Sequence, residues 1–542
     1  MTWQQDYAPL GGSVGWSALV AALPVLVLFL MLGVKRTAAW IAATTALAAA
    51  FVIALVVYGM PAGLAVLSAM YGAAFGIFPI AWIVFSSILL YRLAVDTGAF
   101  EVIKDSVGGL TSDRRLQVLL IAFAFGAFVE GAAGFGAPVA VSGAMLVGLG
   151  FSPFQAAGLC LLANTAPVAF GSLAIPVTTL ATVTGLPVMA LSQMTGRLCA
   201  LISLFLPGYL IVVMTGWRRA LEVLPVIVVA GASFAGTQFF VSNYIGPELT
   251  DVSSALVAIV AMVVIIRAGG AGRAGKAGPA GGAGRAISAR EILWAWTPYI
   301  LLVIFVLVWG QDAFKKWIDG LTTMLIPVPG LHNVIVRVPP VTGAASPYAA
   351  TFVLNWLSAA GTACFLACVA SALLLRVRPA QFARIYGATF KQLALPMLTI
   401  ASMLALAYLM NYSGMTSTVG LALASTGWTF PFFSAVLGWL GVFLTGSDTA
   451  SNALFGNLQV VTANALGLNP VLTASVNSAA GVMGKMIALP SIAVAVAATG
   501  LTTADESRLF RFTVTHSILL ALVMGLVAMA YAYVVPGWVP SQ

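Results

Sequence analysis

The chain has 542 residues, of which 61% are hydrophobic and 7% are charged, and its mean hydropathy is +1.05. No segment resembles a soluble domain, and the composition predicts an all-α polytopic membrane protein, because one helical span needs about 20 apolar residues. The net charge of +9 needs no nucleic-acid partner to explain it, since basic residues gather in short loops, as the positive-inside rule expects of cytoplasmic connections.

The chain opens with three expected spans. Residues 16–34 form the first expected span, and the Lys-Arg pair at positions 35 and 36 places its end in the cytoplasm and the amino terminus outside. A second span returns outward, and residues 61–76 are small and apolar, as in an interfacial or partly inserted helix. A third span ends near Arg92, where a mixed-charge cytoplasmic connection, residues 92–115, begins.

A polar stretch follows at residues 128–141, with the sequence Phe-Val-Glu-Gly-Ala-Ala-Gly-Phe-Gly-Ala-Pro-Val-Ala-Val. Glu130 is the one charged residue between positions 116 and 196. An ionisable side chain inside a span costs roughly 2.5–3.5 kcal/mol, so its default interpretation is functional. Residues 116–129 rise only about 21 Å, short of the roughly 30 Å hydrocarbon core. We therefore expect a helix that breaks near mid-membrane and exposes backbone to a solute path at Gly131, Gly134 and Gly136.

The rest of the first half contains five apolar segments, at residues 137–149, 153–170, 198–215, 221–241 and 252–266. Asn164 and Thr165 supply neutral hydrogen-bonding groups within the second segment, and an acidic outer turn with Glu248 and Asp251 separates the last two. Residues 267–290 are mostly Gly and Ala, with five basic residues and no acid, a composition that is flexible and cannot build a core. We expect a first transmembrane repeat (1–266), a cytoplasmic linker (267–290) and a second repeat (291–542).

The second half has expected spans at residues 294–309, 349–375, 393–411, 428–444 and 513–534, with the carboxyl terminus outside. A proline-rich section, residues 311–348, is expected to be extracellular. A second polar stretch, residues 443–456, reads Phe-Leu-Thr-Gly-Ser-Asp-Thr-Ala-Ser-Asn-Ala-Leu-Phe-Gly. Asp448 and Lys485 are the only charges between positions 392 and 504, and neutral hydrogen-bonding groups surround them at Ser447, Asn452, Asn477 and Ser478.

The two polar stretches belong to an internal repeat. Phe128, Gly131, Asn164 and Arg197 have counterparts 313 to 315 positions later, at Phe443, Gly446, Asn477 and Arg511. The helix that leads to Glu130 starts in the cytoplasm, whereas the helix that leads to Asp448 is expected to start outside. The halves are therefore predicted to be inverted, which is the usual plan of secondary transporters that bind their solute at the repeat interface.

The chemistry of these stretches suits an anion. Broken helices offer free N–H groups and a positive dipole end to a bound carboxylate. Lys485 is expected either to bind substrate or to form a structural pair with a carboxylate such as Asp448. Asp448 and Glu130 are the proton-carrier candidates, with Asp448 slightly favoured because polar groups and Lys485 lie near it in sequence.

The stretches at 128–138, 164–171 and 444–455 resemble the bacterial L-lactate permease family over nearly the whole chain. The resemblance implies proton symport of lactate and of related 2-hydroxy monocarboxylates such as glycolate across the inner membrane, and kinship with inverted-repeat carriers that use an elevator motion. At positions 488–491 the family tends to read Ser-Pro-Gln-Ser, where this chain reads Ala-Leu-Pro-Ser. That difference bears on the choice of substrate.

Other classes of function remain to be weighed. A sodium-coupled or broader organic-anion carrier is the nearest alternative, and a channel is another. An intramembrane enzyme would need a convergent nucleophile and base or a metal cluster, but the sequence has no histidine pair or cysteine–histidine cluster within the membrane. No nucleotide-binding motif is present. We therefore expect no enzyme activity, cofactor or metal, and as partners only a small monocarboxylate, protons and the lipid bilayer, with the oligomeric state left open.

Overall fold

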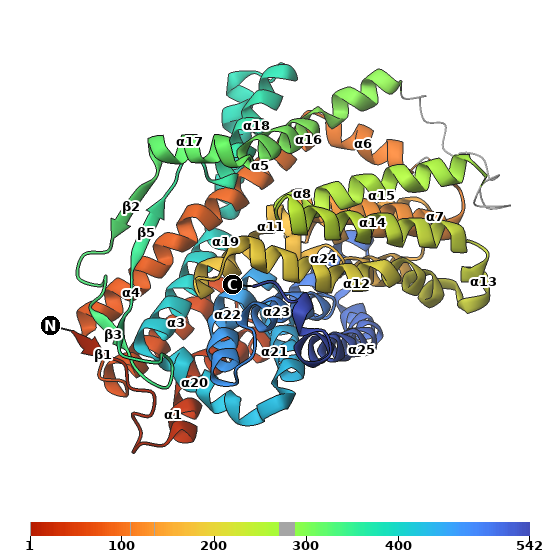
Figure 1. Ribbon diagram of the computed structural model, residues 1–542. Coiled ribbons are helices and arrows are strands. Elements are labelled where there is room, and N and C mark those ends of the chain that lie inside the picture. Colours follow the sequence, from red (N-terminus) through yellow and green to blue (C-terminus); the bar gives the residue numbers. More distant parts are fainter. Residues whose placement is uncertain (1, 109, 135, 270–287, 542) are drawn as a thin grey trace.

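The structure is a computed structural model that describes residues 2–108, 110–134, 136–269 and 288–541. Over these residues, twelve helical stretches are long and apolar enough to cross a membrane, and one bent pair, Pro153–Ala163 with Val168–Thr184, turns by 65°. The predicted all-α polytopic fold is confirmed (Figure 1). Most of the linker expected at 267–290 lies outside the described residues. Of its two ends, Arg267 closes a helix and Ser288 caps the next one.

The first half of the chain forms one short strand and a series of helices. They are, in order, β1 (Trp3–Gln4), α1 (Val14–Ala21), α2 (Leu23–Phe29), η1 (Leu30–Val34), α3 (Ala39–Val56), α4 (Ala62–Phe75), η2 (Gly76–Ala81), α5 (Trp82–Asp96), α6 (Ala99–Gly108), α7 (Arg114–Gln117), η3 (Val118–Phe125), α8 (Gly126–Ala132), α9 (Ala137–Gly148), α10 (Pro153–Ala163), η4 (Val168–Phe170), α11 (Gly171–Thr184), α12 (Val188–Thr215), α13 (Trp217–Leu221), α14 (Leu224–Tyr244) and α15 (Thr250–Arg267). Among these, η1, η2 and η3 are π-helical and η4 is a 3₁₀ turn.

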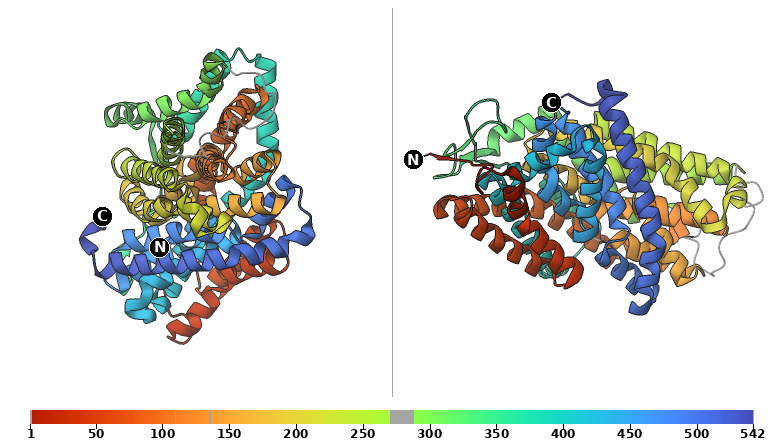
Figure 2. Two further views of the ribbon diagram at one scale, coloured as in Figure 1. Left: turned by 90° about the vertical axis from the view of Figure 1, so that its right-hand side faces the viewer. Right: turned by 90° about the horizontal axis from the view of Figure 1, so that it is seen from below.

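The second half adds four short strands near its start. Its elements are α16 (Ala289–Trp309), α17 (Asp312–Thr322), β2 (Met324–Pro327), β3 (Ile335–Arg337), β4 (Ser346–Pro347), β5 (Thr351–Leu354), α18 (Ala360–Leu374), α19 (Pro379–Ser413), α20 (Met415–Leu423), η6 (Ala424–Thr429), α21 (Phe430–Thr445), α22 (Asp448–Ala465), α23 (Pro470–Lys485), α24 (Leu489–Thr499), η7 (Thr503–Asp505), α25 (Glu506–Tyr533) and η8 (Pro536–Trp538). The last long helix, α25, lies along the outside of the bundle in both views of Figure 2.

Two very long helical stretches pack side by side at the left of Figure 1, and we call them the scaffold helices. One is α4–η2–α5, residues 62–96, and the other is α19, and each has 35 residues. Their backbones touch at glycine, because a Cβ on Gly72 would lie 2.3 Å from the Leu404 carbonyl oxygen. Residues 61–76, expected as a separate interfacial helix, are instead the first part of the α4–α5 stretch. The kink at Phe78 and Pro79 bends the stretch without ending it.

The proline-rich section at 311–348 is more ordered than a plain loop. It contains α17 and strands that form two small sheets, one of β1, β3 and β4 and one of β2 and β5. Strand β1 from the amino terminus pairs in parallel with β3, and the Gln5 amide donates to the carbonyl oxygens of Asn411 and Tyr412 at the end of α19. These contacts join the start of the chain to the second half.

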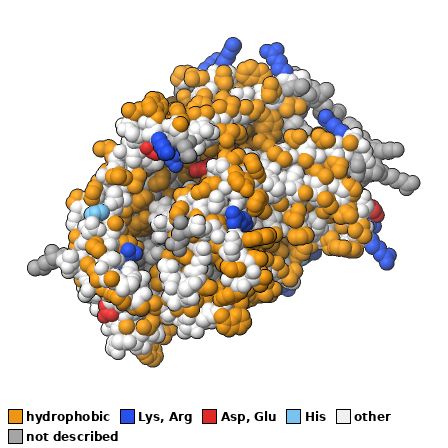
Figure 3. All heavy atoms as spheres, viewed as in Figure 1, with side chains coloured by type: hydrophobic (Ala, Val, Ile, Leu, Met, Phe, Trp, Pro, Cys, Tyr) orange, Lys and Arg blue, Asp and Glu red, His pale blue; other side chains and the backbone are white. Residues whose placement is uncertain are grey.

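Hydrophobic side chains cover much of the face of the molecule shown in Figure 3. Large apolar residues on the outer helices are strongly exposed, for example Phe205 on α12 at 71% and Val260 on α15 at 62%. In water such a continuous apolar surface marks an interaction site, whereas in a bilayer it contacts lipid. This surface supports a multi-pass membrane protein.

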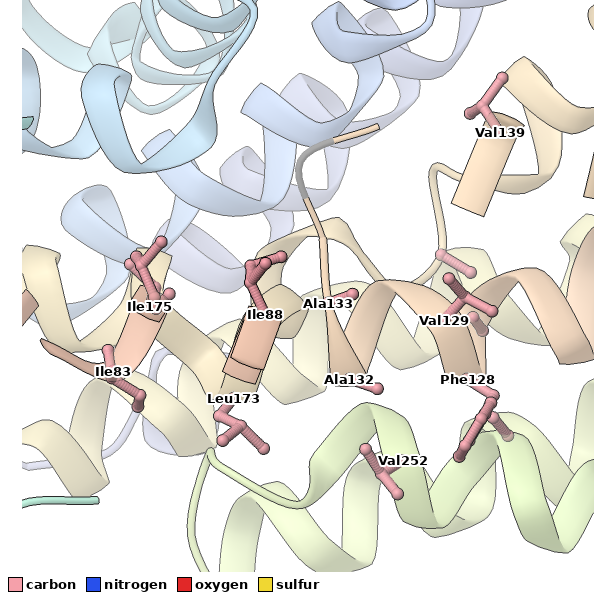
Figure 4. Packing of buried hydrophobic residues seen from close by; sticks show 14 of the residues in the cluster. Ile83, Ile88, Phe128, Val129, Ala132, Ala133, Val139, Leu173, Ile175 and Val252 are labelled. Atoms are coloured by element: carbon pink, nitrogen blue, oxygen red, sulfur yellow. The ribbon is translucent and has the colours of Figure 1, made fainter. Parts of the chain in front are cut away.

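The helix that carries Glu130 is, by contrast, enclosed by protein. Residues 114–132 run as α7, η3 and α8, and 94% of the residues in their apolar segment are buried inside the protein. Phe128 and Ala132 of α8 lie beside Val252 of α15 (Figure 4). The break expected at Glu130 comes slightly later, because α8 continues to Ala132 before the chain leaves the helical path. The helical backbone hydrogen bonds of α8 therefore continue past Glu130 and Gly131.

Candidate functional site: a cavity between four broken helices

Four helices break near one place in the interior. The breaks lie between α8 and α9, between α10 and α11, between α21 and α22, and between α23 and α24. The half-helices that follow the breaks pack crosswise, α9 against α24 and α11 against α22. Residues at the start of each of these half-helices line the region between the breaks, so the positive dipole ends of the four helices lie there.

Glycine and serine shape the breaks that flank the two acids. Gly134 and Gly136 adopt φ of +62° and +83°, and Gly446 adopts +73°, a left-handed conformation that is costly for residues with a Cβ. Gly446 closes α21 through a hydrogen bond to the Val442 carbonyl oxygen, and the Ser447 hydroxyl accepts from the Ala450 N–H to cap α22. This turn sets Asp448 at the first residue of α22, at its positive end.

The breaks enclose a cavity of about 220 Å³. Both polar stretches contribute to its wall, although they are more than 300 residues apart in sequence. The lining residues are Glu130, Gly136, Val168, Gly171, Ser172, Ile175, Pro176, Gly446, Ser447, Asp448, Thr449, Lys485, Pro490, Ser491 and Val494. A small cavity that combines helix N-termini, hydroxyl groups and one lysine is suited to a small organic anion.

Glu130 and Lys485 form an ion pair at this cavity. Lys485 Nζ lies 2.7 Å from Glu130 Oε1, and the two side chains are 12% and 3% exposed. The second oxygen, Glu130 Oε2, accepts a hydrogen bond of 2.9 Å from the Asn164 amide. Gly171 leaves room for this arrangement, because a Cβ there would lie 2.7 Å from Glu130 Oε1. The structural partner of Lys485 is therefore Glu130, and not Asp448 as sequence proximity suggested.

Asp448 lines the same cavity in a different environment. Its Oδ2 accepts a hydrogen bond of 2.6 Å from the Ser478 hydroxyl, while its Oδ1 has no hydrogen-bond partner among the described residues. Two amide side chains hold the Ser478 hydroxyl in place: Asn477 donates to Asn452, and Asn452 donates to Ser478. Asp448 is 3% exposed and has no ion-pair partner in the described part of the chain.

Comparison with known proteins identifies the family. A sequence model described as L-lactate permease matches residues 17–535. The chain belongs to the L-lactate permease family. It is 46% identical over 569 residues to the L-lactate permease of Bacillus subtilis (strain 168), with 100% of both chains covered. It is 43% identical over 555 residues to the L-lactate permease of Escherichia coli (strain K12), covering 99% of this chain and 100% of that one. It is also 44% identical over 561 residues to the glycolate permease GlcA of that strain, with 100% of both covered. The resemblance inferred from the motifs is confirmed.

In this member of the permease family, the site residues predicted from the sequence fall into three groups according to where they lie relative to the cavity. Glu130, Gly136, Ser447, Asp448 and Lys485 line the cavity. A second group lies behind the wall and holds the acids, namely Asn164, Asn452, Asn477 and Ser478. The others face elsewhere: a Cβ on Gly134 would meet the Ser172 hydroxyl, Gly131 packs on α15, and the buried Thr165 hydroxyl has no partner among the described residues.

Sequence reasoning missed two features of this permease-family site. Ser172 and Ser491 line the cavity, and the Ser172 hydroxyl donates to the Ala133 carbonyl oxygen, which joins two of the breaks. Asp251, expected in a solvated outer turn, is 1% exposed in the first turn of α15, and neither carboxyl oxygen has a partner in the described chain. A Cβ on Gly131 would lie 2.8 Å from the Asp251 Cβ, which places a third acid directly behind Glu130. Because Asp251 lies next to a turn, its burial could not be predicted from the sequence.

The turn that opens α11 is strained. Ser172, Leu173 and Ala174 have φ of 48°, 58° and 60°, and each left-handed residue with a Cβ costs roughly 1–2 kcal/mol. We expect Ala174→Gly to remove this cost and raise the thermal stability of the detergent-solubilised protein, by up to about 1 kcal/mol after the entropy of glycine is subtracted. Ala181→Gly, later in the same helix, is the matched control and should lower stability. A thermal-shift measurement in which both variants are destabilised would contradict the left-handed turn.

Proposed function

We propose that the chain is a secondary transporter that carries L-lactate, and related small 2-hydroxy monocarboxylates such as glycolate and D-lactate, together with a proton across the bacterial inner membrane. The observation that carries this proposal is the convergence, on a single small cavity, of four half-helix N-termini, one lysine and one carboxyl that has no ion-pair partner among the described residues. The substrate class is supported by the relatives, which are named L-lactate permeases and glycolate permease. The permease family argues against an enzyme.

The substrate carboxylate binds at the helix starts and to Lys485. An ammonium group has three N–H donors, and Glu130 uses one of them, so Lys485 can hold Glu130 and a substrate carboxylate together. The pair with Glu130 holds the Lys485 side chain at the wall of the cavity. The 2-hydroxyl group of the substrate is matched by the hydroxyl groups of Ser172, Ser447 and Ser491, which line the same wall.

Asp448 carries the proton. A second anion beside an ionised carboxylate in the membrane interior is expensive, so Asp448 takes up a proton when the substrate binds and releases it when the substrate leaves. The substrate anion enters only beside this neutral form, because two adjacent anions would repel each other. Substrate and proton are then bound together and released together, which is symport. Glu130 is the weaker candidate, because its carboxyl oxygens are already engaged by Lys485 and Asn164.

The two halves are proposed to act as inverted repeats with both chain termini outside and the 267–290 linker in the cytoplasm. The paired breaks in α8–α11 and α21–α24 and the two 35-residue scaffold helices support this division. An elevator motion of the broken-helix part against the scaffold is the form of alternating access that the division favours.

Uptake of labelled L-lactate into proteoliposomes tests the proposal. Uptake should follow an inward proton gradient, collapse when an uncoupler is added, and continue when sodium is replaced by choline. Unlabelled glycolate and D-lactate should compete. Uptake that requires sodium, or that ignores both the pH gradient and the uncoupler, would contradict proton symport.

A further inference from the structure

A second cavity adjoins the central one. It measures about 580 Å³ and shares Gly136 and Val494 with the wall of the central cavity. A third hollow, of about 850 Å³, shares Tyr91, Val95 and one face of α9 with the second. The shared face of α9 carries the small residues Ala140 and Val141. The three hollows therefore follow α9 from the central cavity to the end of the molecule that carries the basic residues predicted to be cytoplasmic.

One arginine in the second cavity lacks a partner. Arg92, on α5, is half-buried and lines this cavity, yet it makes no hydrogen bond or ion pair with any described residue. Arg384 lines the same cavity but is already paired, with its Nη2 lying 3.3 Å from Asp96 Oδ2, and its side chain is 71% exposed. Gln392 adds an amide to the lining of this cavity. The free guanidinium is the one uncompensated cation among the described residues that line this cavity.

We propose that the second cavity is a further carboxylate-binding subsite on the cytoplasmic path of the substrate, and that Arg92 is the group that binds the carboxylate there. A guanidinium presents a rigid fork of N–H donors that matches a carboxylate in a bidentate manner. Because the second cavity adjoins the central one, the positive charge of Arg92 raises the local concentration of anions at the inner entrance. This inference rests on the proposed function, because it takes the transported acid as the ligand.

Directional kinetics in proteoliposomes of defined orientation test the role of Arg92. Arg92→Gln should raise the internal L-lactate concentration needed for half-maximal efflux by roughly tenfold, since a charge-assisted hydrogen bond is lost. The external concentration for half-maximal uptake should change less than about twofold, because the two subsites are separate. Arg92→Lys should recover part of the internal affinity, and Arg267→Gln, an exposed arginine at the end of α15, is the matched control. Equal changes in both directions, or no change, would overturn the assignment.

Accessibility gives a second measurement that needs no transport. Ala140 lines both outer hollows, so Ala140→Cys should react with a membrane-impermeant thiol reagent supplied from the cytoplasmic side, and L-lactate should slow the reaction. The four native cysteines are buried, and the parent protein measures their background. Labelling only from the extracellular side, or none, would overturn the path even if Arg92→Gln failed to fold. If the parent protein shows no proton-driven uptake while Ala140→Cys is labelled as expected, the proposed coupling fails and the path stands.

Discussion

Asp448→Asn is expected to reduce proton-driven accumulation of L-lactate by more than about tenfold, which is roughly 1.4 kcal/mol in free energy, while leaving exchange of L-lactate for L-lactate measurable. Asparagine retains an oxygen that can accept the Ser478 hydrogen bond, so the wall of the cavity stays intact. It cannot gain or lose a proton, however. Because loaded states on both sides contain a neutral residue at 448 in either protein, exchange between them survives, but the proton gradient no longer drives net uptake.

The measurement compares accumulation and counterflow in the same proteoliposome preparation. Asp6→Asn is the matched control, since Asp6 is exposed near the amino terminus and does not line the cavity. Its accumulation and exchange should both equal those of the parent protein. Accumulation by Asp448→Asn that still responds to the pH gradient would contradict its role as the proton carrier and leave Glu130 as the remaining candidate.

The sequence predicted much of this site because charge is rare in the chain. An acid or a lysine within a long apolar segment can be found by inspection, and glycines beside it predict a broken helix. The offset of 313 to 315 positions also predicted that the two polar stretches play equivalent parts. Both stretches do line one cavity, together with Lys485.

Partners and burial were harder to predict. Lys485 and Glu130 are 355 positions apart, and no local pattern says which of two acids, one near in sequence and one distant, a lysine will contact. Asp251 lies just after a turn, where acids are usually solvated, and only the packing of α15 on Gly131 buries it. The strands at 324–354 depend on pairing with the distant amino terminus and with each other, so single-segment propensity did not find them. Each miss concerns a contact between segments far apart in sequence.

Removing one partner of the Glu130–Lys485 pair should lower both the stability of the protein and its affinity for the substrate. Lys485→Met leaves the Glu130 carboxylate buried without its cation, and Glu130→Gln leaves the lysine without its anion. Breaking a buried pair in this way costs about 3–5 kcal/mol. We therefore expect both single variants to have lower thermal stability in detergent. Glu222→Gln is the matched control, because it breaks an ion pair with Arg115 in which the glutamate side chain is 63% exposed, and such a pair contributes only about 0–1 kcal/mol.

The double variant Glu130→Gln with Lys485→Met separates structure from function. Both charges are gone, so no buried ion lacks a partner, and stability should return close to that of the parent protein. Transport should not return, because the substrate carboxylate has lost a charge-assisted hydrogen bond worth roughly 1.5–3 kcal/mol, or about 10- to 150-fold in affinity. Uptake and exchange should fall together in Lys485→Met and in the double variant, unlike in Asp448→Asn. A double variant that transports L-lactate normally would show that the pair is only structural. Normal binding in Lys485→Met with none in Asp448→Asn would instead reverse the roles of these two residues.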